Sequence, residues 1–218
     1  MEIARIAPHG TMFHFKTGES WDLNCFLIER ENRLYLIDTG RGCADAQEMR
    51  HYIISKYSGK QLIVINTHYH WDHTWGNGVF SDCMIIANSL CPELYKAEFS
   101  SLAGSVRSAG EPTLCLPSVT IDSRLHIAFD KLLLFTAKGH TPDGLCVLDE
   151  IDGTLYVGDC IGDKVDMPLP ELDDTVQDYA HTLEVLERLQ FDKLLSGHNV
   201  PLTKSFLSTI KAELKKGL

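Results

Sequence analysis

The sequence predicts an α/β protein in which strands come first and helix and strand then alternate, twice over. Two observations carry this prediction: short apolar runs of strand length, and longer segments whose apolar residues recur every three or four positions. The chain has 218 residues, of which 44% are hydrophobic and 23% charged, and these values are ordinary for one compact, well-buried domain. We therefore expect a single domain over residues 1–218.

The expected elements can be taken in order along the chain. Met49 and Ile53 lie at helical spacing ahead of Ser58 and Gly59, which end the helix, and Asp152-Gly153 is a strong hairpin signal between two apolar runs. Residues 104–117 are compatible with a loop or a weak helix. Strand-like segments are expected at residues 25–28, 34–37, 62–65, 84–87, 126–137, 145–148, 155–157 and 193–195, and helices over residues 44–57, 92–101 and 174–189.

Charge and hydropathy limit the partners and the location. The formal net charge is −10, which argues against a nucleic-acid partner, because such partners need a basic surface that displaces counterions. No run approaches the ~20 apolar residues that cross a bilayer, and the N-terminus lacks the features of a secretory signal. Seven cysteines without a Cys-x-x-Cys pair fit reduced, mostly buried thiols. We expect a cytoplasmic protein with a small-molecule substrate and no membrane partner. The sequence does not determine the oligomeric state.

The strongest chemical signal is a cluster of four potential metal ligands within six positions. His68, His70, Asp72 and His73 follow directly after residues 62–65, a wholly apolar run typical of a strand buried on both faces. In an extended segment, side chains two positions apart point the same way, so His68 and His70 can close on one metal. Asp72 and His73, at the turn into a helix, can reach a second one. Imidazole and carboxylate suit zinc, with iron and manganese also compatible.

Three further candidates stand at the ends of predicted strands. His140, Asp159 and His198 each follow a glycine, which lets the backbone turn and leaves the next side chain at the rim of a sheet. Each alone would more often be structural. Together they extend the cluster to seven potential ligands.

These segments resemble the five motifs of the metallo-β-lactamase superfamily, with a glyoxalase II-like metal motif, and they span residues 38–198. The segments are Asp38-Thr39-Gly40, Thr67-His68-Tyr69-His70-Trp71-Asp72-His73, Gly139-His140-Thr141-Pro142, Gly158-Asp159 and Ser196-Gly197-His198. The resemblance implies a four-layer αβ/βα sandwich with two central mixed sheets and a centre of two divalent metal ions. It also implies ligand roles: His68, His70 and His140 for the first metal, Asp72, His73 and His198 for the second, and Asp159 for both. Asp38 would orient a ligand from outside the coordination sphere.

The expected function is a metal-dependent hydrolase, with zinc as the first choice of metal. A hydroxide that bridges the two metals would attack an ester, thioester, lactone or amide carbonyl, and Asp72 would be both ligand and proton carrier. Two alternatives stay open: a mononuclear-iron oxidoreductase that acts on a persulfide-type thiol, and a nuclease or phosphodiesterase of the same fold.

Several residues near the motifs bear on the pocket and not on metal binding. Asp143-Gly144 and Asn199 stand where many relatives have Gly-Ser and Gly, and Cys160 is expected in the core. Only twenty residues follow His198, which argues against the C-terminal glutathione-binding domain of glyoxalase II. The remaining pocket candidates are Trp71 and Trp75 as apolar walls or core, and Arg41, Lys138 and Lys164 as partners of a substrate carboxylate or plain surface charge.

Overall fold

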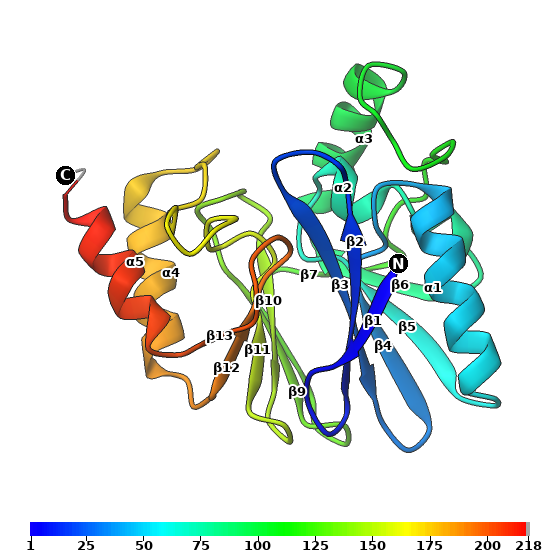
Figure 1. Ribbon diagram of the computed structural model, residues 1–218, viewed down its shortest axis with the longest axis horizontal. Helices are drawn as coiled ribbons and strands as arrows, with labels where there is room; N and C mark the ends of the chain where they lie inside the picture. The colour runs from blue at the N-terminus through cyan, green and yellow to red at the C-terminus, as the bar shows by residue number, and fades with distance from the viewer. Residues whose placement is uncertain (217–218) are drawn as a thin grey trace. The chain divides into compact units, whose positions relative to one another are not determined.

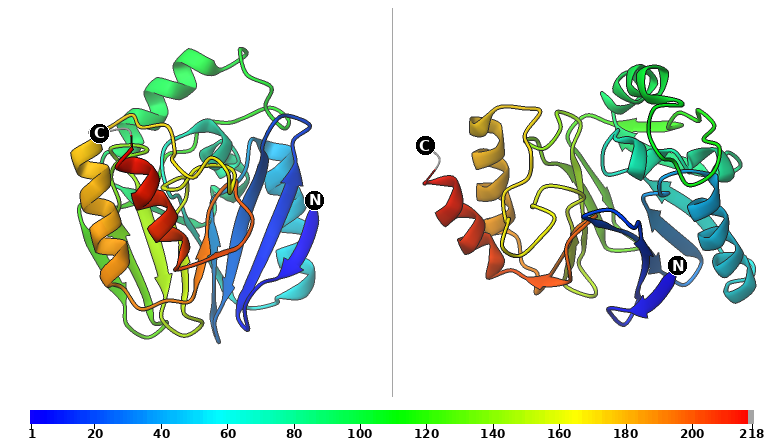
Figure 2. Two further views of the ribbon diagram at one scale, coloured as in Figure 1. Left: turned by 60° about the vertical axis from the view of Figure 1, so that its left-hand side comes forward. Right: turned by 45° about the horizontal axis from the view of Figure 1, so that its top comes forward.

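The computed structural model describes residues 1–216 and divides into two compact units, of which the first is Met1–Asp122 and the second begins at Ser123. Each unit has its own mixed sheet with helices packed on it (Figures 1 and 2). The two predicted central sheets are thereby confirmed, while the single domain over residues 1–218 stays a prediction. Every helix among the described residues is too short or too polar to span a bilayer.

The first unit contains a seven-stranded sheet whose strands lie side by side in chain order. Neighbouring strands are antiparallel from the first to the fourth and parallel from the fourth to the seventh. The parallel strands therefore present their carboxyl ends at one edge, where loops carry functional side chains. The strands are β1 (Glu2–Arg5), β2 (Gly10–Lys16), β3 (Asp22–Glu29), β4 (Arg33–Ile37), β5 (Gln61–Ile65), β6 (Met84–Asn88) and β7 (Val119–Ile121).

Three α-helices and one 3-10 helix complete the first unit: α1 (Cys43–Lys56), α2 (Trp71–Thr74), η1 (Asn77–Phe80) and α3 (Cys91–Leu102). Helix α1 connects the parallel strands β4 and β5 and packs Ala46, Met49 and Ile53 against the sheet. Helix α2 is a single turn that follows β5 without any intervening strand. The ligand cluster is thus carried by a short loop and a short helix at the carboxyl end of a buried strand.

The second unit contains a six-stranded sheet in the order β13-β12-β11-β10-β9-β8, in which only β11 and β12 are parallel. Helices α4 (Val176–Arg188) and α5 (Phe206–Leu214) pack on it side by side (Figure 2), and their apolar residues join the sheet in one core. The strands are β8 (Arg124–Ile127), β9 (Leu132–Thr136), β10 (Leu145–Asp149), β11 (Thr154–Tyr156), β12 (Lys193–Leu195) and β13 (Leu202–Thr203).

The predicted elements are present, with one difference, and the open choice between loop and weak helix is resolved. The apolar segment 126–137 is not one strand but the hairpin of β8 and β9, which turns at Lys131 with a positive φ of 53°. The segment 104–117 is a loop without helix or strand. Strands β1 and β2, which extend the first sheet, are an addition to the sequence prediction.

One ion pair joins α1 to the turn after the 3-10 helix and generates a test of stability. Arg50 of α1 donates from Nη1 and Nη2 to the two carboxylate oxygens of Asp82, both at 2.6 Å, and these bonds lower the pKa of Asp82 to about 2. A carboxyl with a lowered pKa stabilises the fold above its unfolded pKa of ~3.9 and loses this effect as the pH falls toward the folded value. Because Asp82 is more than half exposed, solvent screening limits the contribution to below about 1 kcal/mol.

We expect Asp82→Asn to lower the free energy of unfolding at neutral pH by about 0.5 kcal/mol, in the range of partly exposed ion pairs. The difference from the parent should shrink as the pH falls from about 4 toward 2. Urea unfolding at a series of pH values measures both. The matched control is Glu184→Gln, which removes an exposed partner of Arg188 on α4 and should change little. A difference for Asp82→Asn that persists undiminished at the acid end would contradict this assignment.

Candidate metal centre

Asp38 is the buried carboxylate around which the first set of ligands is arranged. It directly follows β4 and has a positive φ of 61°, a conformation that aspartate tolerates better than most residues. Its Oδ1 accepts the backbone N–H of Thr67 at 2.7 Å, and its Oδ2 accepts the Thr67 hydroxyl at 2.8 Å and Nδ1 of His73 at 2.9 Å. One carboxylate therefore joins the end of β4, the end of β5 and helix α2.

The backbone around Asp38 holds α2 in place. Thr39 donates both its N–H and its hydroxyl to the carbonyl of His73, at 2.9 and 3.1 Å. Gly76, just after α2, approaches so closely that a Cβ there would lie 2.0 Å from the carbonyl oxygen of Thr39. Only glycine fits this contact, so the glycine is needed for α2 to reach the strand ends.

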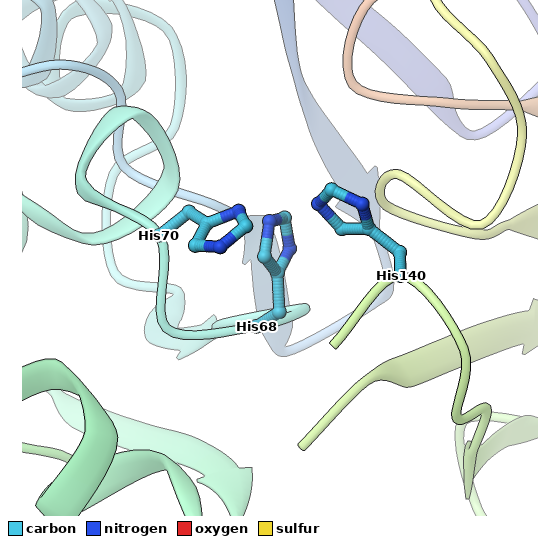
Figure 3. Close-up of side chains that lie close together, drawn as sticks. All are labelled: His68, His70 and His140. Atoms are coloured by element: carbon cyan, nitrogen blue, oxygen red, sulfur yellow. The ribbon is translucent and has the colours of Figure 1, made fainter. Parts of the chain in front are cut away.

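The predicted alternation of His68 and His70 is present in the structure. Their rings stand edge to face with centroids 4.7 Å apart (Figure 3), and each offers a nitrogen within 4.8 Å of one on the other. His68 is buried and His70 half-buried. The two side chains can bind one ion.

Asp72 and His73 form the second half of this set, on the single turn of α2. Both are buried, and Oδ2 of Asp72 lies 3.6 Å from Nε2 of His73. The rings of His68 and His73 are 4.1 Å apart between centroids. All four predicted ligands of the first unit, with Asp38 behind them, therefore lie together.

The hydrogen bonds define which nitrogen each histidine presents. A carboxylate only accepts, so Nδ1 of His73 donates to Asp38. The Thr67 hydroxyl gives its proton to Asp38, so Nδ1 of His68, 3.0 Å from Oγ1 of Thr67, donates as well. In both rings Nε2 then carries the lone pair, as a metal ligand requires.

The second unit supplies the other three predicted ligands. His140 follows β9, Asp159 follows β11, and His198 follows β12, each after a short turn at the carboxyl end of its strand. Oδ2 of Asp159 lies 3.7 Å from Nε2 of His140 and 3.0 Å from Nε2 of His198. Nδ1 of His140, which Figure 3 also draws, donates to the backbone carbonyl of Glu171 at 2.9 Å, so its Nε2 too carries the lone pair.

Electrostatics concentrate negative charge behind the first set. Burial raises the pKa of the Cys25 thiol well above its usual range, and the nearby carboxylates of Asp38, Asp45 and Asp72 raise it further. Arg41 is the cation that opposes them, and its guanidinium already binds Asp45. Three buried carboxylates near one arginine favour a cation.

The remaining candidates from the sequence divide between core, surface and pocket. Trp75 is 1% exposed and belongs to the core, and so does Cys160, as expected. Lys138 and Lys164 are exposed, whereas Arg41 and Trp71 line a cavity.

Two contributors were not singled out from the sequence, and a third was named without a role. Thr67 was visible in the motif, but its role follows only from its contacts with Asp38 and His68. The Glu171 carbonyl is a backbone group and has no sequence signal. Asn199, noted as a departure from relatives, donates from Nδ2 to the carbonyl of Gly162 at 2.8 Å and so ties the turn after β12 to the loop that follows Asp159.

Comparison with models of known protein families shows which family the chain belongs to. The family model described as the metallo-beta-lactamase superfamily matches residues 21–198, most of the chain. The chain belongs to the metallo-β-lactamase superfamily. The resemblance inferred from the motifs is confirmed. A search among curated proteins returned no significant sequence match.

Solved structures of the superfamily have the same fold. A metallo-β-lactamase from Pontibacter korlensis is 19% identical with a TM-score of 0.76 over 98% of both chains. The DIM-1 metallo-β-lactamase is 17% identical with a TM-score of 0.77 over 100% of this chain and 98% of the other. TMB-1 is 18% identical with a TM-score of 0.73 over 99% and 97%. These matches confirm the predicted α/β sandwich with two mixed sheets. The His and Asp clusters of this superfamily member are compatible with a metal site.

The contacts of Asp38 generate a test. Asn in place of Asp38 keeps the shape and one acceptor oxygen, but it cannot accept three hydrogen bonds as the carboxylate does. We expect Asp38→Asn to lower metal affinity about 10- to 100-fold, because His73 loses the partner that fixes its ring. The metal-free protein should also lose about 1–3 kcal/mol of stability.

Competition with a chromophoric chelator measures the affinity, and urea unfolding the stability. Asp22→Asn, at a half-exposed carboxylate beside His14, is the control and should leave metal affinity unchanged. Parent-like metal affinity in Asp38→Asn would show that Asp38 does not orient a ligand.

Proposed function

We propose that the protein is a hydrolase with a dinuclear metal centre, most compatible with zinc, that cleaves an ester, thioester, lactone or amide bond of a small molecule. One observation carries the proposal: seven histidine and aspartate side chains lie in two compact sets, and in three of the histidines Nδ1 donates a hydrogen bond, so that Nε2 is the nitrogen with the lone pair. Histidines with a purely structural role would not need to share this arrangement, in which Nδ1 donates and Nε2 carries the lone pair.

In the proposed grouping each ion takes ligands from both sets. His68, His70 and His140 would hold the first ion, Asp72, His73 and His198 would hold the second, and Asp159 would serve both. Membership of the superfamily, matched across residues 21–198, supports this grouping. Seven ligands are also too many for a single ion of four or five ligands.

The residues fit metal ions better than they fit one another. With Nδ1 of His73 donating to Asp38, the Nε2 lone pair faces Oδ2 of Asp72 at 3.6 Å, and two acceptors cannot bond without a cation between them. The same holds for Nε2 of His140 and Oδ2 of Asp159 at 3.7 Å. In the proposed grouping, the second ion would satisfy the pair of His73 and Asp72, and the first ion the pair of His140 and Asp159.

Two divalent ions at these ligands would supply Lewis acidity: they lower the pKa of water toward ~7 and polarise a carbonyl. The protein supplies the rest. Five neutral imidazoles and two carboxylates leave the loaded site net positive, which favours an anionic transition state. Asp72 is buried and its carboxylate lies beside His73, so we assign it the movement of the proton as well as metal binding.

The substrate is assigned only by class. Two of the relatives with matching structures, from Pontibacter korlensis and DIM-1, are named metallo-β-lactamases, and one DIM-1 structure is of the enzyme exposed to ceftazidime. At 16–19% identity this likeness shows the fold alone, so a β-lactam is one candidate amide among several bond types. The net charge of −10 supports a small-molecule substrate over a nucleic acid. A cytoplasmic location stays a prediction.

Hydrolysis of a substrate panel by two variants tests the proposal. The panel holds a p-nitrophenyl ester, a thioester, a lactone and a β-lactam, each measured across a zinc titration. We expect Asp72→Asn to remain ~10²- to 10⁴-fold slower than the parent even when metal is restored, because it loses both a charged ligand and the proton carrier. His140→Ala should chiefly weaken the first ion, and excess metal should recover more of its activity.

The two variants control for each other, since both remove a proposed ligand and only one removes the proton carrier. If metal-saturated Asp72→Asn hydrolyses the best panel substrate as fast as the parent, the proton-carrier role is wrong. If the metal-loaded parent hydrolyses nothing in the panel but oxidises a thiol persulfide with iron, the hydrolase proposal is wrong.

A further inference from the structure

A cavity of about 430 Å³ lies in the first unit, beside the motifs but built from residues outside the ligand set. Its volume falls within the ~300–1,000 Å³ typical of small-molecule sites. The lining residues come from the loop between β2 and β3, the turn before α1, the start of α2 and the loop after α3: Lys16, Thr17, Glu19, Trp21, Arg41, Trp71, Val106, Arg107, Ser108 and Ala109.

One part of the lining is aromatic. Trp21 and Trp71 are both half-buried and stand edge to face with ring centroids 6.2 Å apart. The ring of Trp71 also packs on buried Trp75 at 5.7 Å, which holds it against the core. Half-buried indoles with fixed rings offer an apolar surface at low entropic cost to a flat or acyl group. Trp71 directly follows the proposed ligand His70, so a group held here would lie next to the start of the metal motif.

The other part of the lining is basic. Three cations and one carboxylate face the cavity, in a protein whose net charge is −10. Lys16 and Arg107 are exposed, and their ion pairs with Glu2 at 3.5 Å and Glu19 at 4.0 Å are surface pairs of little strength. The lining thus carries more cations than carboxylates, with Glu2 and Asp45 pairing with Lys16 and Arg41 from outside it, and cations placed at the wall of a cavity suit an anionic group on the ligand.

Arg41 is the preorganised cation of this lining. Its Nε and Nη2 donate to Asp45 at 2.8 and 3.1 Å, and Asp45 is buried and does not itself line the cavity. The carboxylate thus fixes the guanidinium from behind. A guanidinium has five N–H donors, and two are used by Asp45, so the others remain for a ligand.

The part of the cavity wall that Arg41 and Ala109 form is also fixed, by backbone hydrogen bonds. Ala109 donates its N–H to the carbonyl of Arg41 at 3.2 Å, and Ala44 donates to the carbonyl of Ala109 at 2.8 Å. Gly42 allows this approach, since a Cβ there would lie 2.7 Å from the carbonyl oxygen of Ala109. The cavity is therefore bounded by hydrogen-bonded backbone, and a ligand would meet a prepared site.

We propose that this cavity binds a small amphipathic carboxylate, with its carboxylate on Arg41 and its flat or acyl group against Trp21 and Trp71. That this ligand is the substrate rests on the proposed function: the cleaved ester, thioester, lactone or amide would then also carry a carboxylate and an apolar group. Binding itself requires neither metal nor hydrolysis, so the two proposals fail separately.

The three tryptophans of the chain are Trp21, Trp71 and Trp75, so intrinsic fluorescence reports directly on this cavity. The probes are phenylacetate, its neutral isostere phenylacetamide, and acetate, titrated against the full chain before and after removal of metal with EDTA. We expect phenylacetate to bind about tenfold more tightly than phenylacetamide, the effect of one charge-assisted contact, and acetate to bind more weakly than phenylacetate. The preference should persist in the metal-free protein and shrink as NaCl rises from about 0.05 to about 0.5 M.

Variants locate the binding. Removal of Arg41 alone would strand buried Asp45, so the double variant Arg41→Gln/Asp45→Asn replaces the ion pair by two amides and should lose the preference for phenylacetate over phenylacetamide. Trp21→Leu should weaken both aromatic probes about equally, with two tryptophans left to report. Arg124→Gln, at an exposed arginine on β8, is the control and should bind as the parent does. If the double variant does not fold, the salt dependence of binding and the titration of the metal-free parent still show whether the cavity prefers a carboxylate.

Two results would overturn the proposal. The first is a carboxylate preference that disappears with EDTA, which would place the anion on the metal ions. The second is equal binding of phenylacetate and phenylacetamide by the metal-free parent. If the substrate panel is not hydrolysed but the preference depends on Arg41 and Asp45, the cavity assignment stands and the hydrolase proposal fails.

Discussion

The carboxylate of Asp38 is the constraint on which the arrangement of the first ligand set depends. Strands β4 and β5 are parallel neighbours, so their carboxyl ends meet at one edge of the sheet. Asp38 at the end of β4 accepts hydrogen bonds from Thr67 at the end of β5 and from His73 on α2. Through Thr67 the same chain of hydrogen bonds reaches His68. One buried anion thereby orients two rings, and burial makes these bonds strong.

Stability and chemistry are carried by different residues in each unit. Apolar side chains of α1 pack on the first sheet, and those of α4 and α5 on the second, so each unit has its own core. The seven candidate ligands lie outside these cores, in loops that follow strands and on the short helix α2. Such loops can vary in length and side chain while the sheets stay in place. The loops around Trp21 and Ala109 line the cavity, and we infer that they define the ligand class.

The sequence alone predicted the ligands better than it predicted their support. His68 and His70 follow a wholly apolar strand, and alternation along an extended chain places both rings on one side, so a local rule was sufficient. The contact of His140 with the Glu171 carbonyl joins residues far apart in the chain. Because the acceptor is a backbone atom, no residue type in the sequence predicts it. The pairing of Trp21 with Trp71 is likewise a matter of tertiary packing.

The errors in the fold prediction have local physical reasons. Strand β2 alternates buried Phe13 and Phe15 with His14 and Lys16, a period-two signal that was present but not used. The sequence predicts one strand-like segment over residues 126–137 because Ile127 and Leu132 are separated by so few residues. Lys131 has a left-handed backbone conformation there. Residues other than glycine adopt this conformation rarely, so a lysine in the sequence does not predict it.

The number of metal ions per chain decides whether the two ligand sets hold two ions. Native mass spectrometry of the protein after EDTA treatment and stepwise addition of zinc gives this number without reference to any substrate. We expect two ions per chain in the parent and one in His198→Ala, which removes a proposed ligand of the second ion only. A single ion per chain at saturating zinc in the parent would show that the centre is not dinuclear.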